Sequence, residues 1–455
     1  MTPDRPRDDD RIVETAAGAV TLERVPQVEG VYRLPHDAVD VTLLLSERLL
    51  RTVEPFAFEQ LQHTLALPGL ERVIVTPDFH PGYGVPIGFT GVSPCHLYPD
   101  TVGPDPACSV SISRITGHRF GSLDKRARRA VLDELERVVV VDRRRQRVPY
   151  GPPIGFDALM EILTGGHRFD KTWVAAHPPL PAWASPKRLV ELEAILHAVT
   201  TPRMLQQIGS IGGGNHFLEV QLGDDGELYV MAHFGSRGLG AAGSRYFFDR
   251  IRDDLTATGS GPLGPEGLLF VAADEPLGEL YLMFQQAMLE YATYNHVVVQ
   301  RAATAVVSEH VGGHATEFLG HIPHNFIERR DGRYWQRKGA TPAYDVGGIP
   351  LLIPGSMSTA SYLLAPGPNA SSLGESVPHG AGRVLSRGLA KKTLDQAAMD
   401  LDLEERGVMA NFRHVPLDEA HAAYKDVDEV IRAVVEPGVA RLVQRLRPVL
   451  VLKGA

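Results

Sequence analysis

The sequence predicts a mixed α/β fold, and three observations support this class. Short apolar segments typical of strands alternate along the chain with longer segments whose apolar residues recur at helical spacing. No Pro-, Gly- or Ser-rich linker and no internal repeat divides the 455 residues. The composition, 44% hydrophobic and 22% charged, is that of a globular protein. We therefore expect a mixed α/β fold that forms one domain over residues 1–455.

The predicted strands share a feature, because several of them run directly into glycine-containing loops. Residues 1–45 are polar at first and become strand-like at GAVTLERV. The segment Glu71–Pro77 reads as a buried strand, and a Gly- and Pro-rich loop, Asp78–Gly88, follows it. Later strands are expected at LEVQL (218–222), at Glu227–Phe234 before GSRGLG, at Ile349–Met357 and at the closing LRPVLVLKG. Polar residues in loops that a rigid scaffold holds are often functional, so we expect one composite site.

Helices are predicted where apolar residues recur at helical spacing, over residues 124–140 and 186–199. Residues 278–311 fit either one long helix or two stacked helices, and the chain becomes helical again after His379. Residues 141–183 carry many Pro, Gly and His residues, and we expect an irregular excursion there.

The charge balance restricts how this chain could bind nucleic acid. A formal net charge of −9 argues against binding over the whole surface. Contacts with nucleic acid would have to be local, and they would weaken strongly as the salt concentration rises. Arginines at positions 143–145 and 147 form one basic run, but such a run more often indicates a solvated loop.

The location of the protein follows from what the sequence lacks. No stretch of about 20 apolar residues predicts a membrane span. The first residues, MTPDRPRDDDR, lack the apolar core of a signal peptide. Cys95 and Cys108 are too few for a disulfide framework, which fits a reducing compartment. We expect a cytoplasmic protein, and the sequence leaves its oligomeric state open.

The run IGGGNHF, Ile211–Phe217, places three glycines before Asn215 and His216. Glycine belongs where the backbone needs a positive φ or a close approach. The run fits a plain turn into a strand. It equally fits a backbone cradle for a phosphate or a metal, with Asn215 and His216 adding side-chain contacts.

Five residues offer metal-ligating atoms in or beside the predicted loops. Asp105 and Cys108 lie in VGPDPACSV, where two prolines keep the chain non-helical, and their carboxylate and thiolate could reach one metal ion or two adjacent ones. His216, His233 and His324 each follow or end a strand-like segment, and imidazole is a common ligand of Zn and Mn. Their spacing matches no zinc signature, so structural roles stay open.

Three further segments contain the residue types that bind phosphate. RKGAT (337–341) and PGSMSTAS (354–361) combine cations, hydroxyls and exposed amides, although no Walker A motif is present. Asn325 follows His324 as Asn215 precedes His216, and both amides could bind phosphate oxygens or water. In HGAGRVLSR (379–387), a helix that starts in the turn would place Arg383 and Arg387 on one face beside a nucleophilic His379. A helix start with solvated arginines is the alternative.

Taken in order, these motifs resemble one family, the RtcB-type RNA-splicing ligases. The resemblance covers about residues 70 to 454, and it rests on PDFHPGYGVPIG, DPAC, GGGNHFLEV, MAHFGSRGLG, HNF, RKGAT, IPGSMSTAS, HGAGRVLSR and a terminal LKG. It implies an RtcB-like fold, with β-sheets flanked by helices around one central cleft that holds two metal ions.

The resemblance also implies roles for individual residues. Ligands for two manganese ions would be Asp105, Cys108 as the bridge, His216, His233 and His324. His379 matches the histidine that becomes guanylylated. The GMP moiety or its phosphate would be bound by Asn215, Glu219, Ser356, Arg383 and Lys453. Asp78, His80 and Arg237 match motif positions without an assigned role.

The activity implied is a GTP- and Mn²⁺-dependent RNA ligase that works in tRNA splicing or RNA repair. It would join RNA 3′-phosphate or 2′,3′-cyclic phosphate ends to 5′-hydroxyl ends through a guanylylated histidine and an RNA–ppG intermediate. Family members often work with an archease-type activator. Two other functions stay open: a metal-dependent phosphohydrolase or nucleotidyltransferase that acts on other nucleic-acid ends, and a nucleotide-binding module without turnover.

The chain departs from the family pattern at three places. The family usually has Gly–Cys–Gly around the bridging cysteine, whereas this chain has Ala107–Cys108–Ser109. Phe234 follows His233 where a small residue is commoner, and Gln336 stands before RKGAT where a histidine is expected. These departures indicate a divergent paralogue that keeps the metal ligands.

Overall fold

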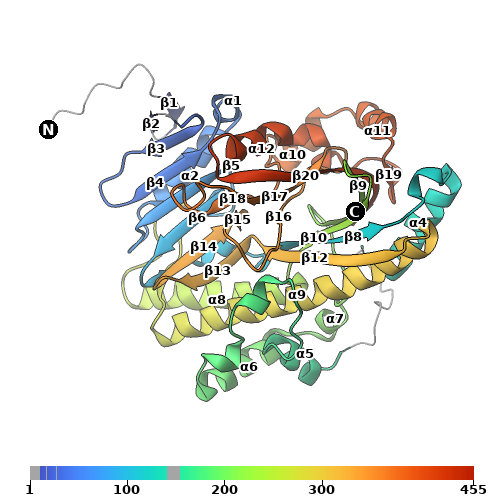
Figure 1. Ribbon diagram of the computed structural model, residues 1–455. Coiled ribbons are helices and arrows are strands. Elements are labelled where there is room, and N and C mark those ends of the chain that lie inside the picture. Colours follow the sequence, from blue (N-terminus) through green and yellow to red (C-terminus); the bar gives the residue numbers. More distant parts are fainter. Residues whose placement is uncertain (1–10, 17, 27, 140, 142–153, 455) are drawn as a thin grey trace.

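The computed structural model describes residues 11–16, 18–26, 28–139, 141 and 154–454 (Figure 1). Its strands form two large sheets with helices packed around them, which confirms the mixed α/β class. That the whole chain forms one domain stays a prediction. The basic run at 143–147 lies outside the described residues.

The first sheet contains the strands of the N-terminal part and one later hairpin. In order across the sheet they are β1 (Arg11–Thr15), β2 (Gly18–Arg24), β3 (Val31–Leu34), β4 (Asp40–Leu44), β5 (Arg72–His80), β6 (Ile87–Ser93), β14 (Arg333–Lys338) and β13 (Asn325–Arg330). All neighbouring strands are antiparallel except β4 and β5.

The second sheet contains the predicted strands of the central and C-terminal parts. Its order is β12 (Ala315–Pro323), β8 (Ser109–Thr116), β10 (Leu228–Phe234), β9 (Phe217–Gly223), β20 (Ala440–Lys453), β17 (Ser361–Pro366) and β16 (Leu351–Ile353), with β19 (Met409–Ala410) paired to β20. Two small sheets join β7 (His96–Leu97) to β11 (Val271–Ala272) and β15 (Ala340–Pro342) to β18 (Ser376–Pro378).

Helices cover the sheets and connect them. They are α1 (Glu47–Leu50), α2 (Pro55–Thr64), α3 (Pro99–Val102), α4 (Lys125–Val138), α5 (Phe156–Leu163), α6 (Pro186–Val199), α7 (Pro202–Leu205), α8 (Arg237–Ala257), α9 (Pro276–Val311), α10 (Arg387–Thr393), α11 (Gln396–Glu405) and α12 (Val427–Val435). Within the described ranges, no helix combines the length and the apolar character needed to cross a membrane.

One long helix settles the alternative left open for residues 278–311. Helix α9 is continuous over 36 residues and packs against β8, β10 and β12 of the second sheet (Figure 1). It ends where Gly312 adopts a left-handed conformation with φ 68°, as a helix C-cap commonly does. Because most of its length is buried, tertiary packing stabilises it as one helix.

The structure differs from the expected local structure at four places. Residues 78–80 belong to β5 rather than to a loop, and GSRGLG leads into α8, which starts at Arg237. The described part of the 141–183 segment contains α5 and two short 3-10 helices, so it is not irregular throughout. The helix expected in the HGAGRVLSR turn starts only at Arg387, so Arg383 does not share a helix face with it.

The two large sheets share one hydrophobic core. A single buried cluster includes Ile74 and Val92 of the first sheet and Ile112 and Met231 of the second. Ordered packing of this kind is rigid, and it holds the loops at the ends of the strands in place.

Candidate active site

Four neighbouring strands of the second sheet bring together the residues predicted to bind metal. Cys108 directly precedes β8 and His216 precedes β9, whereas His233 lies within β10 and His324 follows β12. These strands lie side by side in the order β12-β8-β10-β9. The sheet therefore gathers side chains that are up to 216 positions apart in the sequence at one place.

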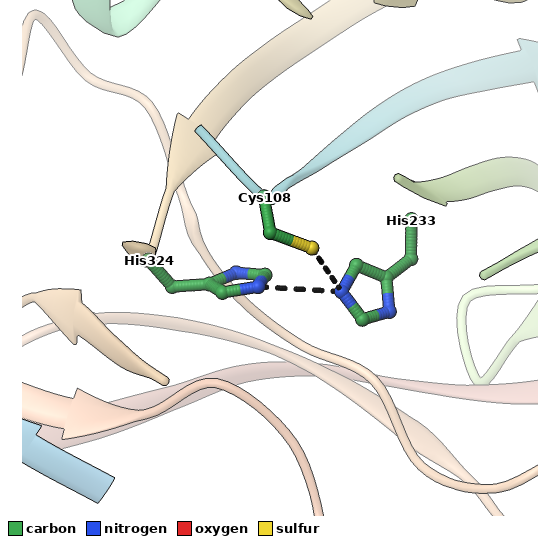
Figure 2. Close-up of side chains that lie close together, drawn as sticks. All are labelled: Cys108, His233 and His324. Atoms are coloured by element: carbon green, nitrogen blue, oxygen red, sulfur yellow. Dashed lines mark hydrogen bonds between the residues drawn. The ribbon is translucent and has the colours of Figure 1, made fainter. Parts of the chain in front are cut away.

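The side chains form two groups of three that share Cys108. In one, the Cys108 sulfur lies 3.2 Å from His233 Nε2, which lies 3.3 Å from His324 Nε2, and all three point toward one another (Figure 2). In the other, His216 Nε2 lies 3.6 Å from the Cys108 sulfur and 3.1 Å from Asp105 Oδ2. Within each group the ligand atoms lie within 4.8 Å of one another.

The chemistry of these donors fits metal ions. Burial lowers the pKa of His233 and of His324 well below the ordinary value, so both imidazoles are neutral and offer a lone pair. The two groups combine imidazole nitrogen, cysteine sulfur and carboxylate oxygen. Burial and the neighbouring Asp105 raise the pKa of the Cys108 thiol well above its usual range, so a metal ion that binds here would displace the thiol proton. Such a mixed set suits manganese, zinc or a similar transition ion better than magnesium or calcium, which prefer oxygen alone. The five donor residues are buried or half-buried, and both groups include the Cys108 sulfur, so the cluster can hold two ions.

His379 lies beside this cluster, with its ring centre 4.9 Å from that of His324 and 6.4 Å from that of His233. Its Nδ1 is 2.6 Å from Asp78 Oδ2 and 3.0 Å from the carbonyl oxygen of Gly339, and its backbone N–H donates to Asp78 as well. Both acceptors face Nδ1, which therefore carries the proton. Nε2 is the other ring nitrogen, and it is the atom that the predicted role of His379 as a nucleophile would use.

Asp78 is fully buried, yet it stays ionised. Burial alone would raise the pKa of this carboxyl group, but the hydrogen bonds from His379 and Thr76 bring the pKa below its usual value. A histidine oriented by a buried carboxylate is a recurrent arrangement for nucleophiles and bases. Sequence reasoning had singled out Asp78 without giving it a role, and His80 now lies beside it, with its Nδ1 bonded to the Asp78 carbonyl oxygen.

A cavity of about 300 Å³ opens beside His379. Of the residues predicted to bind GMP or phosphate, its walls include Asn215, Glu219, Ser356, Arg383 and Lys453. Burial raises the pKa of Glu219 to about 7, so the carboxyl group can be protonated or ionised near neutral pH. The cavity therefore offers hydrogen-bonding groups and cations next to the nucleophilic nitrogen.

Asn325 is placed differently. Its Oδ1 accepts from the backbone N–H of Gly339, and its amide nitrogen donates to the carbonyl oxygen of Asp105. Its amide thus joins the Asp105 loop to the Gly339 turn, and its predicted contact with the nucleotide or its phosphate stays a prediction.

Glu419 forms ion pairs with three cationic side chains of the cavity, and the sequence analysis did not identify it. Lys453 Nζ lies 3.0 Å from Glu419 Oε2, Arg383 Nη1 lies 3.6 Å from Oε1, and Arg387 donates to the same oxygen. Burial alone would raise the pKa of Glu419, but Lys453 and Arg387 lower it to about 2. Its flanking sequence, PLDEAH, carries no signal for such a role.

The glycine run owes its composition to close packing. A Cβ atom on Gly212 would lie 1.9 Å from a guanidinium nitrogen of Arg237, and both Gly212 and Gly214 have a positive φ. Gly213 forms a parallel bridge with Gly454. The run thus packs against Arg237 and the end of β20. It is followed by Asn215, which lines the cavity, and by His216, which belongs to the Cys108 cluster.

The departures from the family pattern have structural correlates. Ala107 adopts φ 60°, a conformation that favours glycine. The Ser109 hydroxyl contacts the carbonyl oxygens of Ala107 and Phe234, and the Phe234 ring stacks on His296 with ring centres 3.6 Å apart. Gln336 accepts from the backbone N–H of Tyr98, so it has a structural place.

Together these features define a mixed α/β protein that combines a cluster able to bind metal with a histidine held by a buried carboxylate and a polar cavity. Comparison with known proteins gives the family. A family model described as tRNA-splicing ligase RtcB matches residues 60–454. The chain belongs to the RtcB family.

Relatives match the chain over nearly its whole length. The RNA-splicing ligase RtcB of Mycobacterium tuberculosis is 34% identical, over 87% of this chain and 100% of the relative. The tRNA-splicing ligase RtcB of Thermococcus kodakarensis is 31% identical, over 87% of this chain and 90% of the relative. The tRNA-splicing ligase RtcB of Nanoarchaeum equitans is 29% identical, over 93% and 98% respectively.

Proposed function

We propose that this protein is a GTP- and Mn²⁺-dependent RNA ligase that joins RNA 3′-phosphate or 2′,3′-cyclic phosphate ends to 5′-hydroxyl ends. Membership in a family whose relatives are named RNA-splicing ligases supports the reaction class. One observation supports the mechanism: His379 lines the cavity, its Nδ1 faces Asp78 and the carbonyl oxygen of Gly339, and its ring lies beside that of His324 in the Cys108 cluster.

The first step is attack of His379 Nε2 on the α-phosphorus of GTP. A P–N bond forms, the P–O bond to the β-phosphate breaks, and pyrophosphate leaves. Asp78 stabilises the positive charge that develops on the imidazole, since its carboxylate already accepts the Nδ1 proton's hydrogen bond. Arg383 and Lys453 line the cavity where negative charge accumulates on the phosphate oxygens.

The later steps transfer the GMP and join the strands. An oxygen of the RNA 3′-phosphate attacks the histidine-bound phosphorus, the P–N bond breaks, and the RNA ends in a phosphoanhydride, RNA–ppG. The RNA 5′-hydroxyl then attacks the phosphorus of the original 3′-phosphate, loses its proton, and GMP leaves. A cyclic phosphate end is first hydrolysed to the 3′-phosphate. The anhydride matters because a phosphate monoester is a poor electrophile.

The residues proposed to hold two Mn²⁺ ions are Asp105, Cys108 and His216 at one centre, and Cys108, His233 and His324 at the other. When bound, such ions neutralise phosphate charge and align the attacking and leaving oxygens. Asn215, Glu219 and Ser356 are proposed to bind the GMP moiety together with Arg383 and Lys453.

We place the reaction in the cytoplasm, in tRNA splicing or RNA repair, and an archease-type activator is a proposed partner. The net charge of −9 makes the contacts with RNA local.

The test is labelling of the protein with α-³²P-GTP in the presence of Mn²⁺, with His379→Ala alongside. We expect acid-labile label on the wild type and none on the variant. Absence of label on folded, metal-loaded wild type, with and without an activator, would contradict the proposal. Label that persists in His379→Ala would move the nucleophile elsewhere.

A metal-dependent phosphohydrolase or nucleotidyltransferase acting on other nucleic-acid ends is the second candidate, because the cluster by itself suits phosphate chemistry. It predicts Mn²⁺-dependent processing of phosphorylated ends that survives in His379→Ala.

A further inference from the structure

Strand β5 is irregular where it carries Asp78. The register between β5 and β6 shifts between Val75 and His80, because Val75 pairs with Phe89 while His80 pairs with Ile87. Four residues of β5, Thr76 to Phe79, therefore face one residue of β6. A bulge of this kind turns a side chain away from the regular alternation, and here it directs Asp78 to His379.

A bulge leaves carbonyl groups without a ladder partner, and side chains satisfy them here. Lys425 Nζ donates to the carbonyl oxygens of Pro77, at 3.0 Å, and of Phe79, at 2.6 Å. The carbonyl oxygen of Asp78 itself is bonded to His80 Nδ1 at 2.6 Å. Lys425 thus holds the backbone on both sides of Asp78.

A lysine is unusual at this position, because its side chain is buried and only 5% of the residue is exposed. No carboxylate lies within ion-pair distance of its ammonium group in the described part of the chain. The nearest compensation for its charge is the carboxylate of Asp78, which attracts it electrostatically. Burial lowers the pKa of Lys425 to about 7, so the charged form of this side chain is costly here, and its presence without an ion pair calls for a role.

The backbone around Lys425 ties it to the nucleophile's loop. Its N–H donates to the carbonyl oxygen of Gly382 at 2.9 Å, and Val384 donates back to Ala423. A Cβ atom on Gly382 would lie 2.4 Å from the Asp78 carbonyl oxygen, so the two segments are in close contact. On the other side Asp426 caps helix α12, which packs against β5.

We infer that Lys425 is a positioning residue for the reaction of His379, because its ammonium group fixes the β5 bulge and faces the Asp78 carboxylate that orients the histidine. The inference rests on the proposed function of His379. Loss of the ammonium group removes both hydrogen bonds to the carbonyl oxygens of Pro77 and Phe79 and lets the bulge relax. The Asp78–His379 hydrogen bond then weakens, and Nε2 is no longer held toward the α-phosphate.

The test compares Lys425→Met, which removes the donor and the charge, with Lys425→Gln, which keeps a donor without the charge. The first readout needs no GTP: the downfield imidazole N–H resonance of His379 in ¹⁵N-histidine-labelled protein, assigned by its absence in His379→Ala. We expect it to disappear in Lys425→Met and to shift in Lys425→Gln.

The second readout is single-turnover guanylylation at varied GTP. We expect the maximal rate to fall by about 10²-fold in Lys425→Met, a size typical of a misplaced reacting group, with the half-saturating GTP concentration nearly unchanged. Bound Mn²⁺ should stay at the wild-type level. Val434→Ala is the matched control, because it opens a cavity in the helix that packs on β5 and touches none of these hydrogen bonds.

An unchanged resonance and a rate within threefold of wild type in folded Lys425→Met would overturn the inference. So would equal losses in Val434→Ala. If Lys425→Met does not fold, Lys425→Gln decides by the same readouts. If wild type shows the resonance but takes no label from GTP, the proposed function fails, whereas a resonance insensitive to Lys425 refutes the positioning role alone.

Discussion

The metal-type cluster and the nucleophile are built in different ways, although they lie side by side. The cluster is assembled by adjacent strands of one sheet, each of which delivers one ligand at its end. The surroundings of His379 come from separate parts of the fold: the first sheet, the region around β15 and β18, and the segment before α12. These parts supply Asp78, Gly339 and Lys425. The cluster therefore depends on sheet order, whereas the nucleophile depends on packing between separate parts of the fold. Variants around His379 should accordingly change histidine reactivity without changing metal content, whereas loss of the metal ligands should change both.

The largest effect is expected at Cys108, since both groups share its sulfur. Cys108→Ala should remove most bound Mn²⁺ and bring guanylylation below detection, because the thiolate is the shared ligand. His216→Ala should keep the centre formed by Cys108, His233 and His324. Metal analysis of both purified variants checks this. Equal metal loss in the two variants would show that the centres are not separable.

The second largest effect is expected at Asp78, whose carboxylate orients His379. The amide of Asp78→Asn can donate its N–H to His379 Nδ1, which favours the tautomer with the proton on Nε2. Because Nε2 then has no lone pair for attack, a loss of about 10²- to 10⁴-fold in guanylylation is expected. Mn²⁺ content should stay unchanged. A variant that loses metal along with rate would mean that the two halves are coupled.

Glu419→Gln should alter acid stability. The folded pKa of about 2 lies below the ordinary value of 4.5, so the ionised carboxylate stabilises the fold above pH 4.5 and this contribution is lost as the pH falls toward 2. The shift corresponds to about 3 kcal/mol. Denaturant unfolding at pH 7 and pH 4 should show a smaller stability loss on acidification for Glu419→Gln than for wild type. Parallel curves would argue against this ion cluster.

Ala107→Gly should have the smallest effect. Because Ala107 has φ 60°, glycine should relieve strain and raise the free energy of unfolding by about 0.5–1 kcal/mol, after allowing for the greater freedom of the unfolded chain. Thermal unfolding of metal-free protein measures it. A fall in stability would show that the alanine methyl group packs favourably there.

The same contrast explains what the sequence could predict. Cys108, His216, His233 and His324 stand beside strand-like segments, so local pattern and family resemblance located them, and the structure brings them together. The fold class followed from periodicity. Glu419 and Lys425 could not be found, because the cations that pair with Glu419 and the carbonyl groups that bind Lys425 are distant in the sequence, and their flanking residues carry no motif. The bulge that turns Asp78 arises from pairing between strands, which local apolar spacing does not record.

The position of β20 has a consequence for protein quality control. This strand lies between β9 and β17 in the middle of the second sheet, and it carries Lys453 into the cavity. A polypeptide released before residue 440 would lack that lysine and would expose two long unpaired strand edges, which promote aggregation. Truncated molecules should therefore lack the lysine of the cavity and be readily recognised by proteases, so they should not persist alongside the full-length chain.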